Sequence, residues 1–194
     1  MAFLHTAAAT GDEAERLRAE DEAAWGFVPN FGRTFASRPD VYRAWKQLNG
    51  SVRSGMDLGR YELATVAAAA ALRSSYCTLA HGRALAADHL PSDTVIALVR
   101  DGNSDELTAA DRAIVAFAAK VARGAANITV EDIEALHEQG LSDEDILDVT
   151  LAAAARCFFS TVLDATGTTP DAVFQGLEPE LRSALTVGRP IDEA

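Results

Sequence analysis

The spacing of apolar side chains along the chain is helical almost from end to end. Between breaking residues, apolar positions recur three and four residues apart, and no stretch alternates apolar and polar residues for long enough to form a convincing strand. We therefore predict an all-α protein. The expected helices span about 11–26, 40–53, 59–73, a segment starting near 75, 92–100, 107–124, 129–140 and 142–165.

Residues with capping chemistry mark several of these helix ends. Thr108 is expected to be the N-cap of its helix, with Asp111 three residues later and Gly124 as the stop. Thr129 and Ser142 are expected to begin the next two helices in the same way, and Ser92 to cap the helix over 92–100. The aromatic segment between 26 and 40 is punctuated by prolines, so it is expected to form short turns around buried phenylalanines.

Alanine runs at 66–71 and 152–155 indicate how the helices pack. Alanine permits close approach of two helices but buries little apolar area, so such helices need neighbours on several sides. Together with aromatic residues near the N-terminus, this composition favours oligomerisation.

Length, charge and cysteine content narrow the class of protein. A chain of 194 residues suits one domain, 1–194, with flexible ends. The net charge of −12 argues against a nucleic-acid surface, and no basic amphipathic stretch suggests an anionic membrane. The longest apolar run, 64–72, is far shorter than the roughly 20 residues that span a bilayer. Without a signal-peptide pattern, two cysteines indicate a reduced, cytoplasmic protein.

The stretch RSSYCTLAHG, residues 73–82, carries the candidate chemistry. If a helix begins after Ser74, then Ser74 is its N-cap and Cys77 lies in its first turn, where the helix dipole favours a thiolate. His81 is four residues further on the same face and can exchange a proton with the thiol. The alternative is a small buried cysteine with a histidine near it by chance. A metal site has too few ligands here, and we expect no metal or cofactor.

A motif that includes this stretch resembles a known superfamily. Glu62, Ser74, Cys77 and His81 reproduce the spacing E-x11-C-x2-C-x3-H of the alkyl hydroperoxidase D and carboxymuconolactone decarboxylase superfamily, with serine at the first cysteine. The flanks over 28–45 and 154–171 are similar to its peroxidase-related branch, and the resemblance covers about residues 22–171. It implies a compact all-helical domain of the alkyl hydroperoxidase D type, usually in a homodimer or a ring built from dimers.

The resemblance also implies roles for these residues. In the superfamily the second cysteine attacks the peroxide, the first resolves it as a disulfide, and the glutamate and histidine relay protons, partly through water. Carried over, Cys77 attacks, with His81 and Glu62 in the relay. Ser74 cannot form a disulfide, so an external thiol or Cys157 must complete the cycle. In a simple hairpin Glu62 and His81 are offset by roughly 7–8 Å, which a steep helix crossing or a bridging water must close.

Three functions follow as hypotheses. The leading one is a thiol-dependent hydroperoxide reductase with one active cysteine, acting on a small hydroperoxide with an external thiol reductant. The second is a decarboxylase-like lyase in which His81 and Glu62 perform acid–base chemistry without the thiol. The third is a catalytically degenerate oligomeric scaffold or redox sensor, which the missing resolving cysteine favours.

Overall fold

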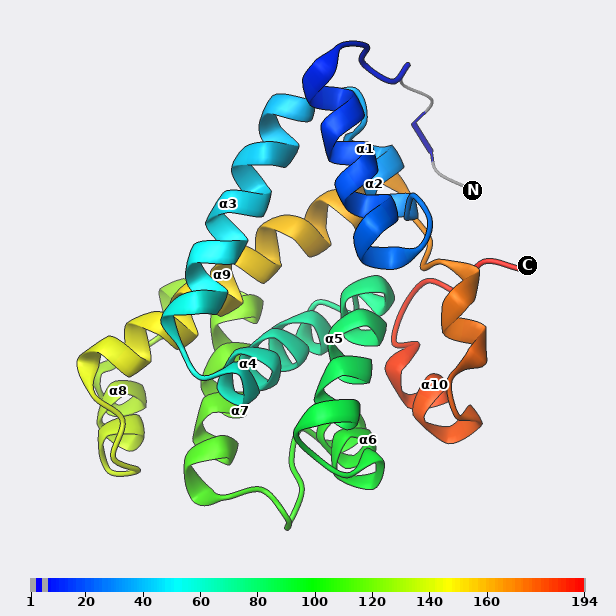
Figure 1. Ribbon diagram of the computed structural model, residues 1–194. Coiled ribbons are helices and arrows are strands. Elements are labelled where there is room, and N and C mark those ends of the chain that lie inside the picture. The colour runs from blue at the N-terminus through cyan, green and yellow to red at the C-terminus, as the bar shows by residue number, and fades with distance from the viewer. Residues whose placement is uncertain (1–2, 5–6, 194) are drawn as a thin grey trace.

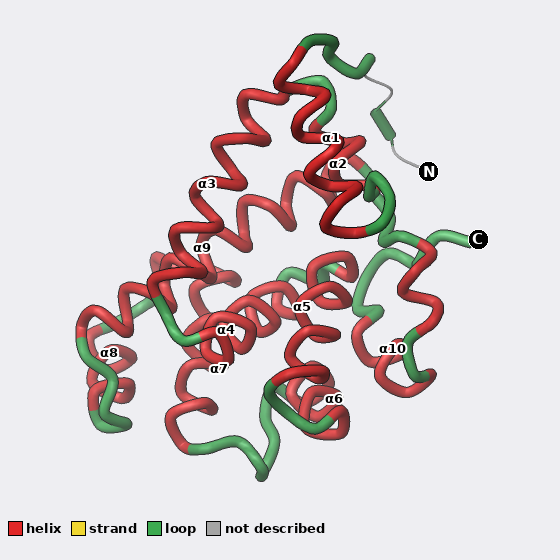
Figure 2. The backbone as a smooth tube through the Cα atoms, viewed as in Figure 1, coloured by secondary structure: helices red, strands yellow, loops and turns green. Residues whose placement is uncertain are grey.

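The computed structural model describes residues 3–4 and 7–193, and the regular structure among them is entirely helical (Figures 1 and 2). The predicted all-α class is therefore confirmed. The expectation of flexible ends falls partly on residues 1–2, 5–6 and 194, which lie outside the described residues. The elements are α1 Asp12–Trp25, α2 Asn30–Phe35, α3 Pro39–Gly55, α4 Leu58–Ala71, α5 Ser75–Asp88, α6 Ser92–Asp101, α7 Ala109–Gly124, η1 Ala125–Asn127, α8 Val130–His137, α9 Asp143–Thr166, η2 Ala172–Gly176 and α10 Pro179–Leu185.

Most helix ends agree with the capping signals. Thr108, Thr129 and Ser142 each form a capping box with the aspartate three residues later, as the sequence predicts for Thr108 and Asp111. Ser92 differs from its predicted role, because Pro91 occupies the N-cap and Ser92 is the first helical residue. The fixed φ of proline suits the extended backbone at an N-cap, and its missing N–H costs nothing there.

The sequence pattern did not predict α2 or α10. Asn30 begins α2, and its backbone N–H donates to the Asp171 carboxylate at 2.9 Å. Asp171 lies 141 positions further along the chain, so the sequence around Asn30 alone predicts only turns. For α10 the local signals were present, since Glu178 accepts from the N–H groups of Glu180 and Leu181 and Pro179 starts the helix.

The alanine-rich helix α4 lies at the centre of the core. Its residues 61–69 are all buried, and it packs against α3, α5, α6, α7 and α9. This confirms that the alanine helices have neighbours on several sides. The small side chains let the neighbouring helix axes approach closely. In Figure 1, α9 runs between the group α1–α3 and the group α4–α7, and it packs against members of both groups.

Helix α9 is also apolar enough to resemble a membrane span. It has 24 residues, and half of its apolar window is buried inside the protein. By length and composition alone it could cross a bilayer, but the core helix of a soluble protein passes the same test. Because α9 is packed between two groups of helices, it fits the description of a core helix.

A tight turn between α4 and α5 sets the start of α5. Arg73 adopts a left-handed φ of 58°, and the N–H of Ser74 donates to the carbonyl of Ala69 at 2.9 Å. The C-terminal segment packs on this turn, where the Gly188 N–H donates to Ser75 Oγ at 2.7 Å. A Cβ on Gly188 would collide with the carbonyl oxygen of Arg73. The turn therefore requires glycine at position 188.

We predict that Gly188→Ala lowers the melting temperature. The added methyl group meets backbone rather than a mobile side chain, and such overpacking costs about 1–3 kcal/mol. Gly176→Ala is the matched control, because nothing lies within 4 Å of its added Cβ. Thermal unfolding followed by circular dichroism measures both variants. Equal melting temperatures for the two would contradict the close packing of the tail on the α4–α5 turn.

Candidate active site

Three helices bring the candidate residues together. Glu62 lies on α4, Cys77 and His81 lie one turn apart on α5, and Arg156 comes from the middle of α9. Helix α5 begins as expected, with Ser74 at the N-cap position and Cys77 as the third helical residue. Only 1% of Cys77 is exposed to solvent, so a reagent can reach its sulfur only through a cavity in the protein.

The glutamate and the histidine are in direct contact. His81 Nδ1 lies 2.6 Å from Glu62 Oε2, so the arrangement of α4 and α5 closes the expected offset without a bridging water. Only 18% of the His81 side chain and 8% of the Glu62 side chain are exposed. When Nδ1 carries the proton and donates to the carboxylate, Nε2 remains free to accept one.

The surroundings of His81 disfavour its charged form. Burial, and after it the charge of Arg156, lower the pKa of His81 below its ordinary value, although the Glu62 carboxylate opposes the shift. His81 is therefore a neutral imidazole near neutral pH. A neutral ring held by a carboxylate is suited to proton relay, because it can accept a proton at Nε2 while it donates at Nδ1.

Arg156 is the residue of this site that the sequence analysis missed. Its Nη1 donates to Cys77 Sγ at 3.5 Å, and the residue is only 4% exposed. Its guanidinium also lies near the rings of Trp45 and Phe159, 5.8 and 5.6 Å from their centroids. Within an alanine-rich helix a single arginine is the available signal, but its direction toward Cys77 depends on how α9 packs.

A cavity of about 310 Å³ opens onto the sulfur. Aromatic rings from α1, α2, α3, α5 and α9 form much of its wall, and polar side chains complete it. The lining residues are Asp21, Ala24, Trp25, Phe31, Tyr42, Trp45, Lys46, Asn49, Gly50, Tyr76, Cys77, Ala80, His81, Arg156 and Phe159. The cavity can hold a small organic molecule with a flat apolar body, and it places that molecule against the thiol.

Glu62 reaches the cavity only through its contact with His81, and two further residues considered in the sequence analysis do not line the cavity either. Ser74 is fully buried, its hydroxyl has no partner among the described residues, and it makes no capping hydrogen bond. Cys157 is half-buried and follows Arg156 on α9, so its side chain leaves the helix about 100° away from that of Arg156. Burial raises the pKa of the Cys157 thiol. Neither residue shares the cavity with Cys77.

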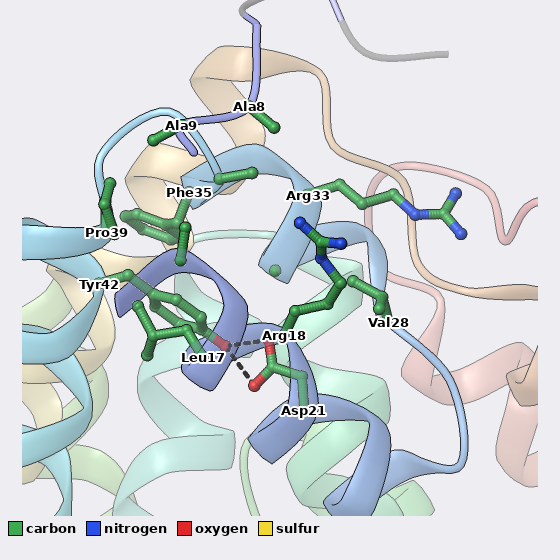
Figure 3. Close-up of a pocket in the computed structure, with 13 residues that line it drawn as sticks. Ala8, Ala9, Leu17, Arg18, Asp21, Val28, Arg33, Phe35, Pro39 and Tyr42 are labelled. Atoms are coloured by element: carbon green, nitrogen blue, oxygen red, sulfur yellow. Dashed lines mark hydrogen bonds between the residues drawn. The ribbon is translucent and has the colours of Figure 1, made fainter. Parts of the chain in front are cut away.

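Figure 3 shows a second cavity, which has a volume of about 420 Å³. Asp21 and Tyr42 line both cavities, and the Tyr42 hydroxyl donates to the Asp21 carboxylate at 2.9 Å. The second cavity is larger but contains no thiol or imidazole. In the described part of the chain, no three His, Cys, Asp or Glu side chains are grouped to hold a metal ion. The reactive groups therefore belong to the smaller cavity.

Comparisons with known proteins concern the family and the fold of the chain. Residues 39–103, which include Glu62, Cys77 and His81, match the carboxymuconolactone decarboxylase family. None of the curated proteins compared with the chain is significantly similar to it in sequence. The debrominase Bmp8, solved as a cysteine-to-alanine variant in complex with 2,3,4-tribromopyrrole, is 19% identical over 95% of this chain and 98% of its own, with a TM-score of 0.74. At that identity the likeness shows the fold alone.

Two solved structures are more similar in sequence. A peroxidase-related protein from Ralstonia eutropha, described as an alkylhydroperoxidase AhpD core, is 27% identical over 89% of this chain and 94% of its own, with a TM-score of 0.80. A peroxidase-related protein from Silicibacter is 25% identical over 90% and 94%, with a TM-score of 0.81. The family match over residues 39–103 and the fold shared with these two structures support a relationship to the superfamily of alkyl hydroperoxidase D and carboxymuconolactone decarboxylase.

Proposed function

We propose that the protein is a thiol-dependent hydroperoxide reductase with one active cysteine. The observation that carries this proposal is the position of Cys77, whose sulfur faces an aromatic cavity beside the Arg156 guanidinium and one turn from His81. A structural cysteine needs neither a cavity nor a cation. A thiol used as a nucleophile needs access for its substrate and surroundings that favour the thiolate.

The reaction assigns a task to each group. The thiolate of Cys77 attacks the terminal oxygen of the hydroperoxide, and the new S–O bond forms as the O–O bond breaks. Sulfur loses two electrons and becomes a sulfenic acid, while the departing alkoxide takes a proton that His81 and Glu62 relay from solvent. Two molecules of an external thiol then complete the cycle, the first releasing water and forming a mixed disulfide, the second regenerating Cys77.

The positions of Ser74 and Cys157 support an external reductant. A local disulfide needs a second thiol close to the first, and neither residue lines the cavity that contains Cys77. A homodimer or ring in the cytoplasm also belongs to this proposal. Exposed apolar side chains along α9 and on α3 offer a surface for a second copy, namely Leu147, Leu151, Phe158 and Leu48.

The aromatic walls favour a second candidate function, reductive dehalogenation of a flat aromatic compound. Bmp8 binds a tribrominated pyrrole, and the cavity here is large enough for a ring of that kind. In that reaction the thiolate attacks the halogen, a sulfenyl halide forms, and the carbon takes a proton. One external thiol then displaces the halide and forms a mixed disulfide, and a second external thiol regenerates Cys77. Turnover of 2,3,4-tribromopyrrole rather than a hydroperoxide would favour this candidate.

We expect a small excess of cumene hydroperoxide to oxidise Cys77 and to leave Cys157 unchanged. Peptide mass spectrometry after trapping with dimedone identifies the oxidised residue, and turnover is measured with an excess of dithiothreitol. Cys77→Ser should abolish turnover, while Cys157→Ser, the matched control, should retain it, because burial raises the pKa of the Cys157 thiol. Hydroperoxide turnover retained in Cys77→Ser would refute the proposed mechanism. Decarboxylation of a carboxymuconolactone by Cys77→Ser would support the lyase hypothesis, and no turnover with any of these substrates would support a scaffold or sensor.

A second prediction concerns the contact between His81 and Glu62. His81→Ala leaves a buried carboxylate without its partner, so we expect a loss of about 3 kcal/mol in the free energy of unfolding. The double variant Glu62→Gln/His81→Gln replaces the pair by neutral amides and should recover most of that stability. Its turnover should remain about 100-fold or more below wild type, because the proton relay is lost. Wild-type turnover in the folded double variant would exclude the relay.

A third prediction follows from the lowered pKa of His81. The unfolded chain binds a proton near the ordinary histidine pKa of about 6.5, whereas the folded protein binds it only at lower pH. The contribution of His81 to stability is therefore complete above that pH and is lost as pH falls toward the folded value. Urea unfolding between neutral and mildly acidic pH should show a shallower decline for Glu62→Gln/His81→Gln than for wild type. Parallel declines would mean that folding does not lower the pKa of His81.

A further inference from the structure

Arg156 carries a buried charge without a carboxylate to balance it. The residue is 4% exposed, no salt bridge to it occurs among the described residues, and its Nε has no hydrogen-bond partner there. Removing an unpaired guanidinium from water is strongly unfavourable. The aromatic faces of Trp45 and Phe159 recover part of this cost. The hydrogen bond of its guanidinium goes to the sulfur of Cys77, 3.5 Å from Nη1.

The other groups around the cavity do not supply a positive charge to the sulfur. Lys46 lies 2.7 Å from Asp21 and 3.2 Å from Glu20, so two carboxylates balance its ammonium group. His81 is held by Glu62, and burial keeps it neutral. The charged and titratable groups that face the site from the packed helices are Asp21, Tyr42, Lys46, Arg53, Tyr61, Glu62, Tyr76, His81 and Arg156.

The tyrosines are also accounted for. The hydroxyl of Tyr42 donates a hydrogen bond to Asp21, and that of Tyr76 donates one to Asp171. Burial, and after it the charge of the neighbouring carboxylate, raises the pKa of each phenol. The Tyr61 hydroxyl donates a hydrogen bond to Asn49 Oδ1 at 2.9 Å. The Tyr61 oxygen also stabilises the charge on Arg156, but it does so less than the sulfur of Cys77. Arg53 is exposed and does not line the cavity, so Arg156 is the buried cation of this site without a balancing carboxylate among the described residues.

We infer that Arg156 is the cation that holds Cys77 as a thiolate, and that the Cys77 thiolate is the counter-ion of this buried arginine. The first turn of α5 adds the positive end of its dipole to the same sulfur. Burial opposes the charge on Arg156, yet the neighbouring sulfur of Cys77, with Tyr61 after it, outweighs burial and raises the pKa of Arg156. Activation of the thiol thus comes from α9, while His81 and Glu62 remain available for the proton that the substrate needs.

This inference deepens the proposed function. It rests on that function only for the step in which the thiolate reacts with a substrate. It concerns ionisation of the thiol in the resting protein, before any substrate binds. Measurements of thiol reactivity therefore test it without a peroxide. A reactive thiolate with no peroxide turnover would uphold the inference and refute the proposed function. Peroxide turnover that does not depend on Arg156 would uphold the proposed function and refute the inference.

The experiment compares iodoacetamide alkylation of Cys77 in a Cys157→Ser background with and without Arg156→Met. Near neutral pH we expect the rate to fall at least tenfold in Arg156→Met, because the thiolate fraction falls. At strongly alkaline pH, where thiols are ionised in both proteins, the rates should agree within twofold. A merely structural role would change access to the cavity and therefore the rate at every pH. Arg156→Lys keeps the charge and should recover most of the neutral rate.

A control and a second measurement cover loss of folding. Arg60→Met removes an arginine that pairs with Asp145 away from the cavity, and its alkylation profile should match the parent protein. If Arg156→Met does not fold, ultraviolet thiolate absorbance decides the matter in folded protein that retains Arg156. The difference between Cys157→Ser and Cys77→Ser/Cys157→Ser near neutral pH should show a thiolate that disappears on unfolding. Absence of that signal, or a neutral alkylation rate unchanged in Arg156→Met, would overturn the inference.

Discussion

The burial of α4 among its neighbours is the constraint on which the site depends. Because its alanines occupy little space, α5 and α9 both pack directly against α4. That packing places Glu62 against His81 and directs Arg156 toward Cys77. A larger side chain on α4 would separate the helices, and side-chain hydrogen bonds between them tolerate only a few tenths of an ångström. The geometry of the site therefore depends on the small alanine side chains of α4.

The site divides its electrostatic work between two pairs. Glu62 and His81 form one pair, in which the imidazole stays neutral because burial and the Arg156 charge outweigh the attraction of the carboxylate. Arg156 and Cys77 form the other, and the low polarity of the aromatic walls strengthens any charge interaction between them. Separation of these tasks suits a reaction that needs a nucleophile without a proton and, moments later, a proton for the leaving group.

The serine at position 74 gives this protein a catalytic cycle without a local disulfide under the proposed function. Its hydroxyl is buried without a partner among the described residues and makes no capping hydrogen bond, so it replaces the first cysteine of the motif without an evident new task. The cavity admits an organic molecule but contains a single thiol. Reduction by a small external thiol entering the same cavity is consistent with that arrangement.

Local sequence signals determined the helical class, most helix bounds and the start of α5 at Ser75, because capping side chains, dipole charges and apolar periodicity act within one or two turns. They also placed Cys77 and His81 on one face, and the resemblance added Glu62. Tertiary structure decided the rest. Asp171 holds the start of α2 from far along the chain, the packing of α4 and α5 brings Glu62 directly to His81, and the orientation of α9 turns Arg156 toward Cys77. Those contacts join residues 19 to 141 positions apart, and the periodicity of one helix contains no information about the side chains of another.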